Sequence, residues 1–315
     1  MKSDISIIIV SYNTRSLLVA CLRSIAATRG NLRLEVIVVD NASGDGSASA
    51  MGEFAFAHVI ANASNVGFGA ANNQGVAAST GRYVLLLNSD TEIRGNCLEG
   101  MLSFADTHPA VAAFGCRVLY PDGTLQRSCM LFRSLTNLTL FATGLSKIFP
   151  RSRFYGRELM SWWTFNEARI VEVIVGCFML IRRSAIDEIG MFDERFFMYA
   201  EEVDWCKRLQ NAGMSAMFVP DWEITHVCGA STAPVARAMI PHLWGSTLKF
   251  IRKHHSGVYY AASVAVVACF FASRGTLLSL ADIFDSRKRE RGRIFIRALG
   301  QLVFNGVDGL CAHRL

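Results

Sequence analysis

Four short polar clusters follow apolar runs early in the chain, each at an equivalent position. Their amide and carboxylate side chains can read a base or a ribose, and their glycines let backbone approach a phosphate, so the pattern suits a nucleotide. Asn, Asp, Ser and Gly also end strands as ordinary turn residues, which explains any single cluster equally well. Four clusters together favour a shared binding site. They are Ser11-Tyr12-Asn13, Asp40-Asn41-Ala42-Ser43, Asn65-Val66-Gly67-Phe68-Gly69 and Asn88-Ser89-Asp90.

One carboxylate, Asp90, is placed to bind a metal ion. It follows the apolar residues Val84 to Leu87, so its oxygens should emerge at the rim of a buried strand, where a hard divalent cation can bind them. Glu92 lies on the same side of an extended chain but can equally face solvent, and we rank it below Asp90. His226 follows a predicted strand and turn, and becomes a second ligand only if the fold brings it to Asp90.

The acidic cluster Glu201-Glu202-Val203-Asp204 opens a predicted helix after an aromatic stretch, Phe196 to Tyr199. The helix terminus lowers a carboxylate pKa and apolar surroundings raise it, which is the kind of tuning that a general base requires. Acids in a first turn also simply stabilise a helix, and that explanation stays open. Lys253 and His255 can grip a phosphate, although a solvated basic helix end explains them as well.

A β-α-β alternation would bring the four clusters together. Between the first two strand candidates, Leu17 to Ile25 has helical spacing, with Asn13 or Thr14 placed to cap the helix. Such alternation predicts an α/β fold with a mostly parallel central sheet flanked by helices, in which ligands lie outside the carboxyl ends of the strands. The strand candidates are Ile5 to Val10, Leu34 to Val39, His58 to Ala61, Tyr83 to Leu87 and Val111 to Phe114.

The middle of the chain is less regular. Pro121-Asp122-Gly123 signals a turn, whereas Leu131 to Trp163 has no clean period and its structure stays open. Val171 to Arg182 is an apolar run, and a helix over Glu201 to Ala212 should end at Gly213. A strand over Ser215 to Pro220 should precede a turn at Asp221-Trp222.

The C-terminal part predicts a helical, apolar tail. Val258 to Ser273 is 16 residues long, slightly short for a spanning helix, and cationic residues flank it. Such a helix can lie on an anionic membrane surface, or pack as an ordinary buried helix. We therefore expect three parts, residues 1–120, 121–245 and 246–315, the last of them associated with a membrane.

Composition indicates a globular, reduced protein. With 315 residues, of which 51% are hydrophobic and 18% charged, the chain can bury a large core without disulfides. Nine cysteines include no Cys-x-x-Cys pair. The apolar run that ends at Val10 is too short and too acidic for a secretion signal, so we expect a cytoplasmic chain. The net charge of +6 is uneven, and a basic run from Arg287 to Arg293 suggests a phosphate-rich partner.

An ordered set of motifs runs through the chain. They are Val10-Ser11-Tyr12-Asn13, Val39-Asp40-Asn41-Ala42-Ser43-Gly44-Asp45-Gly46-Ser47, Asn65-Val66-Gly67-Phe68-Gly69-Ala70-Ala71-Asn72-Asn73, Leu86-Leu87-Asn88-Ser89-Asp90, Gly190-Met191-Phe192-Asp193-Glu194, Glu201-Glu202-Val203-Asp204-Trp205-Cys206, and Gly229-Ala230-Ser231 behind His226. In these motifs and their order, roughly residues 5 to 255 resemble inverting family 2 glycosyltransferases of the GT-A fold, in particular their bacterial rhamnosyltransferase-like branch.

The resemblance implies that residues 1–120 bind the nucleotide-sugar donor and that residues 121–245 bind the acceptor and carry out catalysis. It also implies a role for each matching residue. Asp90 and His226 would hold Mg²⁺ or Mn²⁺, and Glu202 would be the catalytic base, with Glu201 as its competitor because the family often has Asp at this position. The motif lacks the first carboxylate of a full Asp-x-Asp, so we expect a modest metal affinity. The residues that would bind the donor are Ser11, Tyr12, Asn13, Asp40, Asn65, Gly67, Asn73, Asn88 and Ser89.

The implied reaction is a single in-line displacement that inverts the anomeric centre. Glu202 would deprotonate the acceptor hydroxyl as the nucleotide diphosphate leaves. The donor would be a nucleotide sugar, with dTDP-rhamnose the first guess. The acceptor would be a glycan or a polyprenyl-linked glycan of cell-surface polysaccharide synthesis, at the inner face of the cell membrane.

Three other functions are weighed against this one. A catalytically inactive glycosyltransferase-like protein would bind a nucleotide or glycan without turnover, and the intact Asp90, Glu202 and His226 argue against it. A Rossmann dehydrogenase fails because Gly67-Phe68-Gly69 lacks the third glycine of the fingerprint. Nucleic-acid binding is disfavoured because the basic run lacks interleaved aromatic residues.

Overall fold

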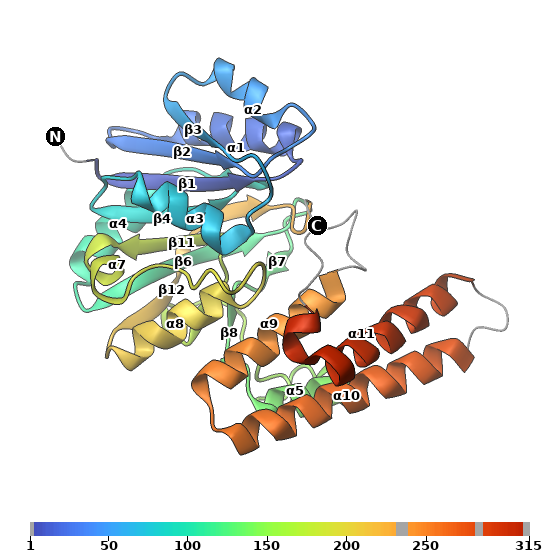
Figure 1. Ribbon diagram of the computed structural model, residues 1–315. Helices are drawn as coiled ribbons and strands as arrows, with labels where there is room; N and C mark the ends of the chain where they lie inside the picture. Colours follow the sequence, from blue (N-terminus) through green and yellow to red (C-terminus); the bar gives the residue numbers. More distant parts are fainter. Residues whose placement is uncertain (1–2, 231–238, 281–285, 311–315) are drawn as a thin grey trace. The chain divides into compact units, whose positions relative to one another are not determined.

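The protein is described by a computed structural model (Figure 1) that covers residues 3–230, 239–280 and 286–310. It forms two units. The first contains Met1–Phe132, Trp163–Arg195 and Glu201–Ser231, and the second contains Arg133–Trp162, Phe196–Ala200 and Thr232–Leu315. The predicted division into three parts stays a prediction.

The first unit contains a mixed central sheet with strand order β3-β2-β1-β4-β11-β6-β12-β5. Strands β3, β2, β1 and β4 are parallel to one another. β6 runs in the same direction as these four strands because β11, which lies between β4 and β6, is antiparallel to both. β12 shares this direction because it pairs with β6 in parallel. The prediction of a mostly parallel sheet is confirmed. The strands are β1 (Ile5–Ser11), β2 (Leu34–Asp40), β3 (Ala57–Ala61), β4 (Tyr83–Asn88), β5 (Thr91–Ile93), β6 (Val111–Leu119), β11 (Phe178–Arg182) and β12 (Ser215–His226).

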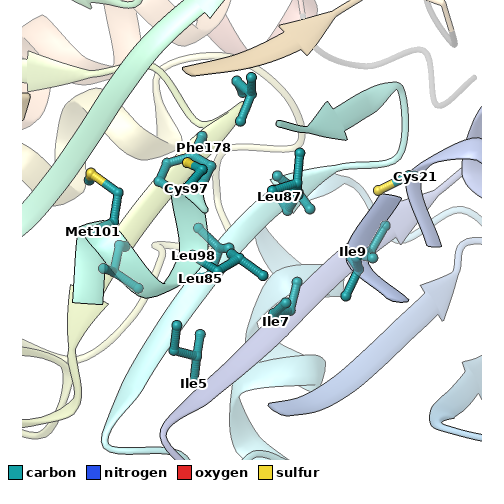
Figure 2. Packing of buried hydrophobic residues seen from close by; sticks show 14 of the residues in the cluster. Ile5, Ile7, Ile9, Cys21, Leu85, Leu87, Cys97, Leu98, Met101 and Phe178 are labelled. Atoms are coloured by element: carbon teal, nitrogen blue, oxygen red, sulfur yellow. The ribbon is translucent and has the colours of Figure 1, made fainter. Parts of the chain in front are cut away.

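Helices cover both faces of the sheet. Alternate residues of β1 and β4, including Ile7 and Leu85, point into a core that helix α4 closes through Leu98 and Met101 (Figure 2). On the other face α3 packs closely, since a Cβ on Gly75 would meet Ile8 Cγ2 at 2.4 Å. The helices are α1 (Arg15–Thr28), α2 (Ser47–Ala50), α3 (Phe68–Ala77), α4 (Cys97–Thr107), α7 (Arg183–Ile189) and α8 (Glu201–Asn211), with a 3₁₀ turn η1 at Met51–Glu53.

The sheet curls at the end of β4. Only Ser89 and Asp90 separate β4 from β5, yet β11, β6 and β12 lie between these two strands in the sheet order. Adjacent strands are about 4.8 Å apart, so in a flat sheet the three intervening strands would separate β4 from β5 by more than two residues can span. The sheet must therefore bend back on itself. The curl delivers Asp90 to the end of β12.

Several local predictions are confirmed and others need correction. Gly123, at φ +81°, closes the predicted turn, and β7 (Leu125–Gln126) follows it. Gly213, at φ +78°, ends α8 as predicted. The prediction of a turn at Asp221-Trp222 was wrong, because β12 continues through a register shift between Val219 and Glu223. The apolar run Val171 to Arg182 is not one element. It contributes to β9 (Arg169–Val171), β10 (Val173–Ile174), which pairs with β8 (Cys129–Met130), and β11.

The second unit is helical. It contains the stretch that the sequence left open, which forms α5 (Leu135–Ala142) and α6 (Leu145–Ile148), together with α9 (Met239–His254), α10 (Gly257–Leu280) and α11 (Ser286–Leu310). The predicted apolar tail is therefore helical, and α10 is longer than the 16-residue run. By length and composition alone, its residues Gly257–Ser279 suffice to cross a membrane.

Candidate active site

The parallel strands bring their polar ends to one edge of the sheet. Ser11 and Asp40 are register partners at the ends of β1 and β2, and Asn88 pairs with Val10 at the end of β4. Because β12 runs in the same direction, it ends at the same edge with His226. Side chains that are distant in sequence therefore converge on this edge.

Asp90 and His226 form the centre of the candidate site. β5 pairs with β12 so that Thr91 faces His226, and the Val227 N–H donates to the Asp90 backbone oxygen at 3.0 Å. The side chains meet as well, with His226 Nε2 3.1 Å from Asp90 Oδ1, and both are buried. Glu92 alternates to the other face of β5 and is exposed.

Neighbouring polar groups fix the orientation of the imidazole. Gln126 Oε1 lies 2.7 Å from His226 Nδ1, where it accepts the Nδ1 proton and leaves Nε2 to face Asp90. Asn88 Nδ2 lies 3.2 Å from Nε2. The buried Asn88 Oδ1 has no hydrogen-bond partner within the described part of the chain, and rotating the amide by a half-turn would exchange these two atoms.

The two side chains favour each other's charged forms. Burial alone would lower the pKa of His226, but hydrogen bonds to Asp90 and Cys177 raise it to about 10. Burial alone would raise the pKa of Asp90, but the hydrogen bond and charge of His226 outweigh burial and lower it. The site therefore holds a carboxylate oxygen at a buried strand end.

These donors suit a divalent cation. Two ligands at adjacent vertices of an octahedron with bonds of about 2.1 Å lie about 3.0 Å apart, and Asp90 Oδ1 and His226 Nε2 are 3.1 Å apart. Asn88 Oδ1, which has no hydrogen-bond partner among the described residues, is a further oxygen at the end of β4. Over the described residues no group of three or more His, Cys, Asp or Glu side chains is placed to hold a metal, so water and a ligand would have to complete such a coordination shell.

Asp40 presents an unused acceptor. Its Oδ2 accepts the Ser43 N–H at 3.1 Å, whereas Oδ1 is buried and has no hydrogen-bond partner among the residues described. A buried carboxylate oxygen without a donor is costly, so this atom calls for a donor from a ligand. Asn13 supports the loop from the side, at φ +53°, by accepting the Gly44 N–H at 2.8 Å and donating its backbone N–H to Ser43 Oγ at 3.0 Å.

The start of α1 corrects the capping prediction. Thr14 does occupy the cap position, but its side chain makes no capping bond there, because its hydroxyl lies between Ser89 Oγ at 2.9 Å and Ser11 Oγ at 3.1 Å. Asp45 takes over and accepts the Arg15 N–H at 2.8 Å. The loop after β2 is thus fastened to the helix after β1.

Asn65, Gly67 and Asn73 shape the loops of the site. Asn41 binds both the Val66 N–H and Asn65 Oδ1, and Asn65 in turn accepts the Gly67 N–H at 3.0 Å. Gly67, at φ +92°, supplies the left-handed conformation from which α3 begins. Asn73 donates to Phe192 O and to Glu194 Oε1, both at 2.9 Å, and so ties α3 to the segment before α8.

The acidic cluster begins α8 in the same unit as Asp90. Glu201 is buried and Glu202 half-buried, and α8 packs against β10 and β12. Asp204 is buried in an ion pair with Arg208 at 3.0 Å, and therefore has a structural role. Arg208 also donates to Ile189 O and Met191 O, and Trp205 Nε1 donates to Gly190 O at 2.9 Å. These bonds anchor the segment from Ile189 to Met191 to α8.

Lys253 and His255 belong to the second unit, and their role as phosphate contacts stays a prediction. His255 stacks on Tyr259 with ring centroids 4.3 Å apart, and Lys253 Nζ lies 6.0 Å from the Phe196 ring centroid. Tyr12 is half-buried at the end of β1, and its role also stays a prediction. Ser231, the last residue of the Gly229-Ala230-Ser231 motif, lies outside the described residues, whereas the Ala230 N–H points to Asp90 Oδ2 at 3.4 Å.

Sequence reasoning gave no positioning role to four residues of the site: Gln126 was not named, and Thr14, Asn41 and Asp45 were named only as a cap candidate or within a motif. They act through hydrogen bonds to residues far from them in sequence, apart from the contacts of Thr14 with Ser11 and of Asp45 with Ser47. Asp45 was inside a quoted motif, and its position before a short helix was the only local signal. Nothing near Gln126 in the sequence indicates a partner 100 residues away.

Comparison with known proteins now gives the family. The sequence profile described as Glycosyl transferase family 2 matches residues 6–190, more than half of the chain. The chain belongs to glycosyl transferase family 2. The predicted membership is confirmed, and the dehydrogenase alternative is excluded. The matched region of this glycosyltransferase includes Asp40 and Asp90 but ends before Glu201, Glu202 and His226.

Two curated relatives are rhamnosyltransferases. N-acetylglucosaminyl-diphospho-decaprenol L-rhamnosyltransferase of Mycobacterium tuberculosis is 28% identical over 272 residues, which is 82% of this chain and 87% of the relative. Rhamnosyltransferase WbbL of Escherichia coli K12 is 27% identical over 172 residues, which is 51% of this chain and 60% of the relative. The family 2 chain is therefore a glycosyltransferase with rhamnosyltransferase homologues, as predicted.

A solved structure supports the fold. The mannosyltransferase PcManGT of Pyrobaculum calidifontis, in complex with GDP-Man and Mn²⁺, superposes with a TM-score of 0.57 at 16% identity, over 97% of this chain and 88% of that one. The expected GT-A fold is thereby confirmed.

The capping role of Asp45 predicts a pH-dependent stability. Burial tends to raise the pKa of Asp45, but hydrogen bonds from Ser47 and Arg15 outweigh it and lower the pKa below 3.8. Its stabilisation is therefore present above pH 3.8 and is lost as the pH falls through the lower folded value. Asp45→Ala should lower the free energy of unfolding by about 1 kcal/mol at neutral pH, and by less at about pH 3, in denaturant titrations.

Asp122→Ala is the matched control. Asp122 accepts the Thr124 N–H at 2.9 Å and the Thr124 hydroxyl at 2.6 Å, just as Asp45 accepts both groups of Ser47. Unlike Asp45, it has no bond to the start of α1. An equal loss in both variants, or a loss for Asp45→Ala that is unchanged by pH, would contradict the capping role.

Proposed function

We propose that this protein is a metal-dependent inverting glycosyltransferase that moves a sugar, in the first instance rhamnose from dTDP-rhamnose, onto a glycan or polyprenyl-linked acceptor for cell-surface polysaccharide. The observation that carries this proposal is the buried Asp90–His226 pair at 3.1 Å, on the sheet edge where Asp40 ends β2. The relatives support the donor sugar and the lipid-linked acceptor, since one of them is named for a decaprenol-linked substrate.

Asp40 supports a nucleotide donor. Its buried Oδ1 has no hydrogen-bond donor among the described residues, and the imide N–H of thymine or uracil, or the ring N–H of guanine, would supply one. Around it, Ser11, Tyr12 and Asn13 from the end of β1 and Asn65 and Gly67 from the start of α3 would enclose the nucleoside, with Asn73 holding the segment before α8. The N–H groups at the start of α3 favour a negatively charged phosphate nearby.

Asp90 and His226 would hold Mg²⁺ or Mn²⁺, with Asn88 and Ser89 beside them at the strand end. When bound, such an ion offsets the negative charge that develops on a leaving diphosphate. Mn²⁺ was bound in the structure of the mannosyltransferase, which supports this cofactor class. Gln126 accepts the proton of Nδ1, so that Nε2 would present its lone pair to the ion once the ion displaces the Nε2 proton.

Glu202 would act as the general base. It is half-buried in the first turn of α8, a helix whose later residue Arg208 binds Ile189 O and Met191 O. It would accept the proton of the acceptor hydroxyl as that oxygen attacks the anomeric carbon from the side opposite the leaving diphosphate, which inverts the configuration. Glu201, more deeply buried, is the competing assignment.

We place the enzyme on the cytoplasmic face of the cell membrane, as a peripheral protein. A polyprenyl-linked acceptor is confined to the membrane, and α10 supplies a long apolar helix in the second unit. This location follows from the proposed acceptor.

Donor binding should be visible as thermal stabilisation. A ligand at 100 times its Kd stabilises the native state by about 2.7 kcal/mol, so the correct sugar nucleotide should raise Tm with Mg²⁺ or Mn²⁺ and raise it less with EDTA. Asp40→Asn places an amide N–H against the base N–H and should weaken that nucleotide by about ten-fold or more. Asp187→Asn, at an exposed position of α7 at the opposite edge of the sheet, should bind it as the unmodified chain does. No stabilisation by any of the dTDP-, UDP- and GDP-sugars would contradict the proposal.

The base assignment is tested by a matched pair of amides. Glu202→Gln removes the proton acceptor but keeps the side-chain shape, so transfer should fall by about 10²- to 10⁴-fold while donor-induced stabilisation is retained. Glu201→Gln should retain most of the transfer. Product formation with the donor identified above and a polyprenyl-linked acceptor is the readout, and near-normal turnover of Glu202→Gln would move the role to Glu201.

A further inference from the structure

The two units carry opposite net charge. The first contains fifteen Lys and Arg against twenty-one Asp and Glu, a net charge of −6, and the second contains seventeen against five, a net charge of +12. The overall +6 therefore conceals a strongly basic helical unit. Part of the excess lies between Arg151 and Arg157, in the stretch whose structure the sequence left open, and part lies on and beside α11. The basic run includes side chains from 287 to 291, which lie outside those described.

The same unit exposes most of the large apolar side chains. Of fourteen large hydrophobic residues with exposed side chains in the described ranges, ten belong to the second unit, which comprises fewer than two-fifths of the residues. Phe304 is 85% exposed, Val258 83% and Ile148 65%. Such a concentration of apolar surface on a highly charged unit indicates a partner that contacts both the apolar and the charged side chains.

Helix α10 presents a continuous uncharged face. Along it, exposed residues recur at intervals of three and four, which places them on one side of the helix. The opposite side is packed, with Val267 and Phe271 fully buried, so the helix stays part of its unit. The exposed face of α10 consists of Val258, Ala261, Ala265, Cys269, Ala272 and Thr276.

The early stretch and the C-terminal helices form one body. The Leu135 N–H donates to the Tyr259 hydroxyl at 2.6 Å, which ties α5 to α10. Phe141 packs between Trp244 and Phe270, with ring centroids 5.5 Å and 5.7 Å away. On α11, the exposed cations Arg293 and Arg297 lie four residues apart, and therefore on one side of that helix, with exposed Ile296 between them.

We propose that the second unit docks peripherally on a membrane leaflet rich in anionic phospholipid. The exposed face of α10 would lie against the boundary between headgroups and acyl chains, and the Lys and Arg side chains of the unit would contact the phosphates. The charge favours this occupant, since two copies of a +12 unit would repel each other whereas anionic headgroups attract it. An uncharged helix face flanked by cations is the pattern of an interfacial helix.

This inference deepens the membrane location in the proposed function, but its test needs neither donor nor acceptor. The full chain is sedimented with vesicles of phosphatidylcholine alone, and with vesicles of phosphatidylcholine mixed with phosphatidylglycerol, at low and high salt. We expect binding to the anionic vesicles, little binding to the neutral ones, and release by high salt. A failure here would leave nucleotide binding and transfer untouched, so the two proposals fail separately.

Two kinds of variant locate the surface. Ala265→Glu puts a charge in the centre of the exposed face of α10, and Val59→Glu puts the same charge on an exposed strand residue of the first unit. The double variant R293E/R297E reverses two cations of α11, and Arg29→Glu reverses an exposed cation of the first unit. Since each basic residue near an anionic surface contributes about five-fold to binding, the double variant should bind at least about ten-fold more weakly, and Ala265→Glu similarly.

Three outcomes would overturn the docking. Equal binding to neutral vesicles would show that charge does not direct it, and control variants that weaken binding as much as the test variants would place the surface elsewhere. Binding that high salt does not reverse would indicate a spanning α10. Circular dichroism of each variant, compared with the unmodified chain, shows whether it is folded, and the α10 and α11 variants test the surface independently.

Discussion

The pairing of β5 with the end of β12 is the constraint on which the candidate site depends. Two residues connect β4 to β5, and the sheet must curl for so short a connection to reach the far side of β12. Once it does, backbone hydrogen bonds place Asp90 beside His226, 136 positions along the chain, without any contribution from the side chains themselves. The buried ion pair then adds to a geometry that the ladder has already set.

The rest of the site is built by loops that hold one another. Asp45 fastens the β2 loop to α1, Asn41 organises the loop before α3, and Asn73 ties α3 to the segment before α8. These links leave Asp40 Oδ1 without a hydrogen-bond partner among the described residues. Preorganisation of this kind matters for transfer reactions, because a ligand that meets rigid donors and acceptors loses less free energy on ordering the site.

The sequence predicted the parts of this molecule that depend on local pattern. Strands β1, β2 and β4 were evident because buried parallel strands are continuous apolar runs, and their polar ends indicated the candidate site. The contact between Asp90 and His226 was not derivable, since strand order beyond β4 depends on long-range pairing that no spacing encodes. The stretch from Leu131 to Trp163 lacked a period because only short helices form there, and the charge separation between units became visible only when that stretch joined α10.

The central claim is that the curled sheet makes Asp90 and His226 one cation site that serves a nucleotide diphosphate. Electron paramagnetic resonance of Mn²⁺ titrated with the protein and a nucleoside diphosphate tests it most directly. We expect a bound signal with nitrogen coupling from an imidazole, which loses that coupling in His226→Gln and weakens strongly in Asp90→Asn. Unchanged Mn²⁺ binding in both variants would contradict it.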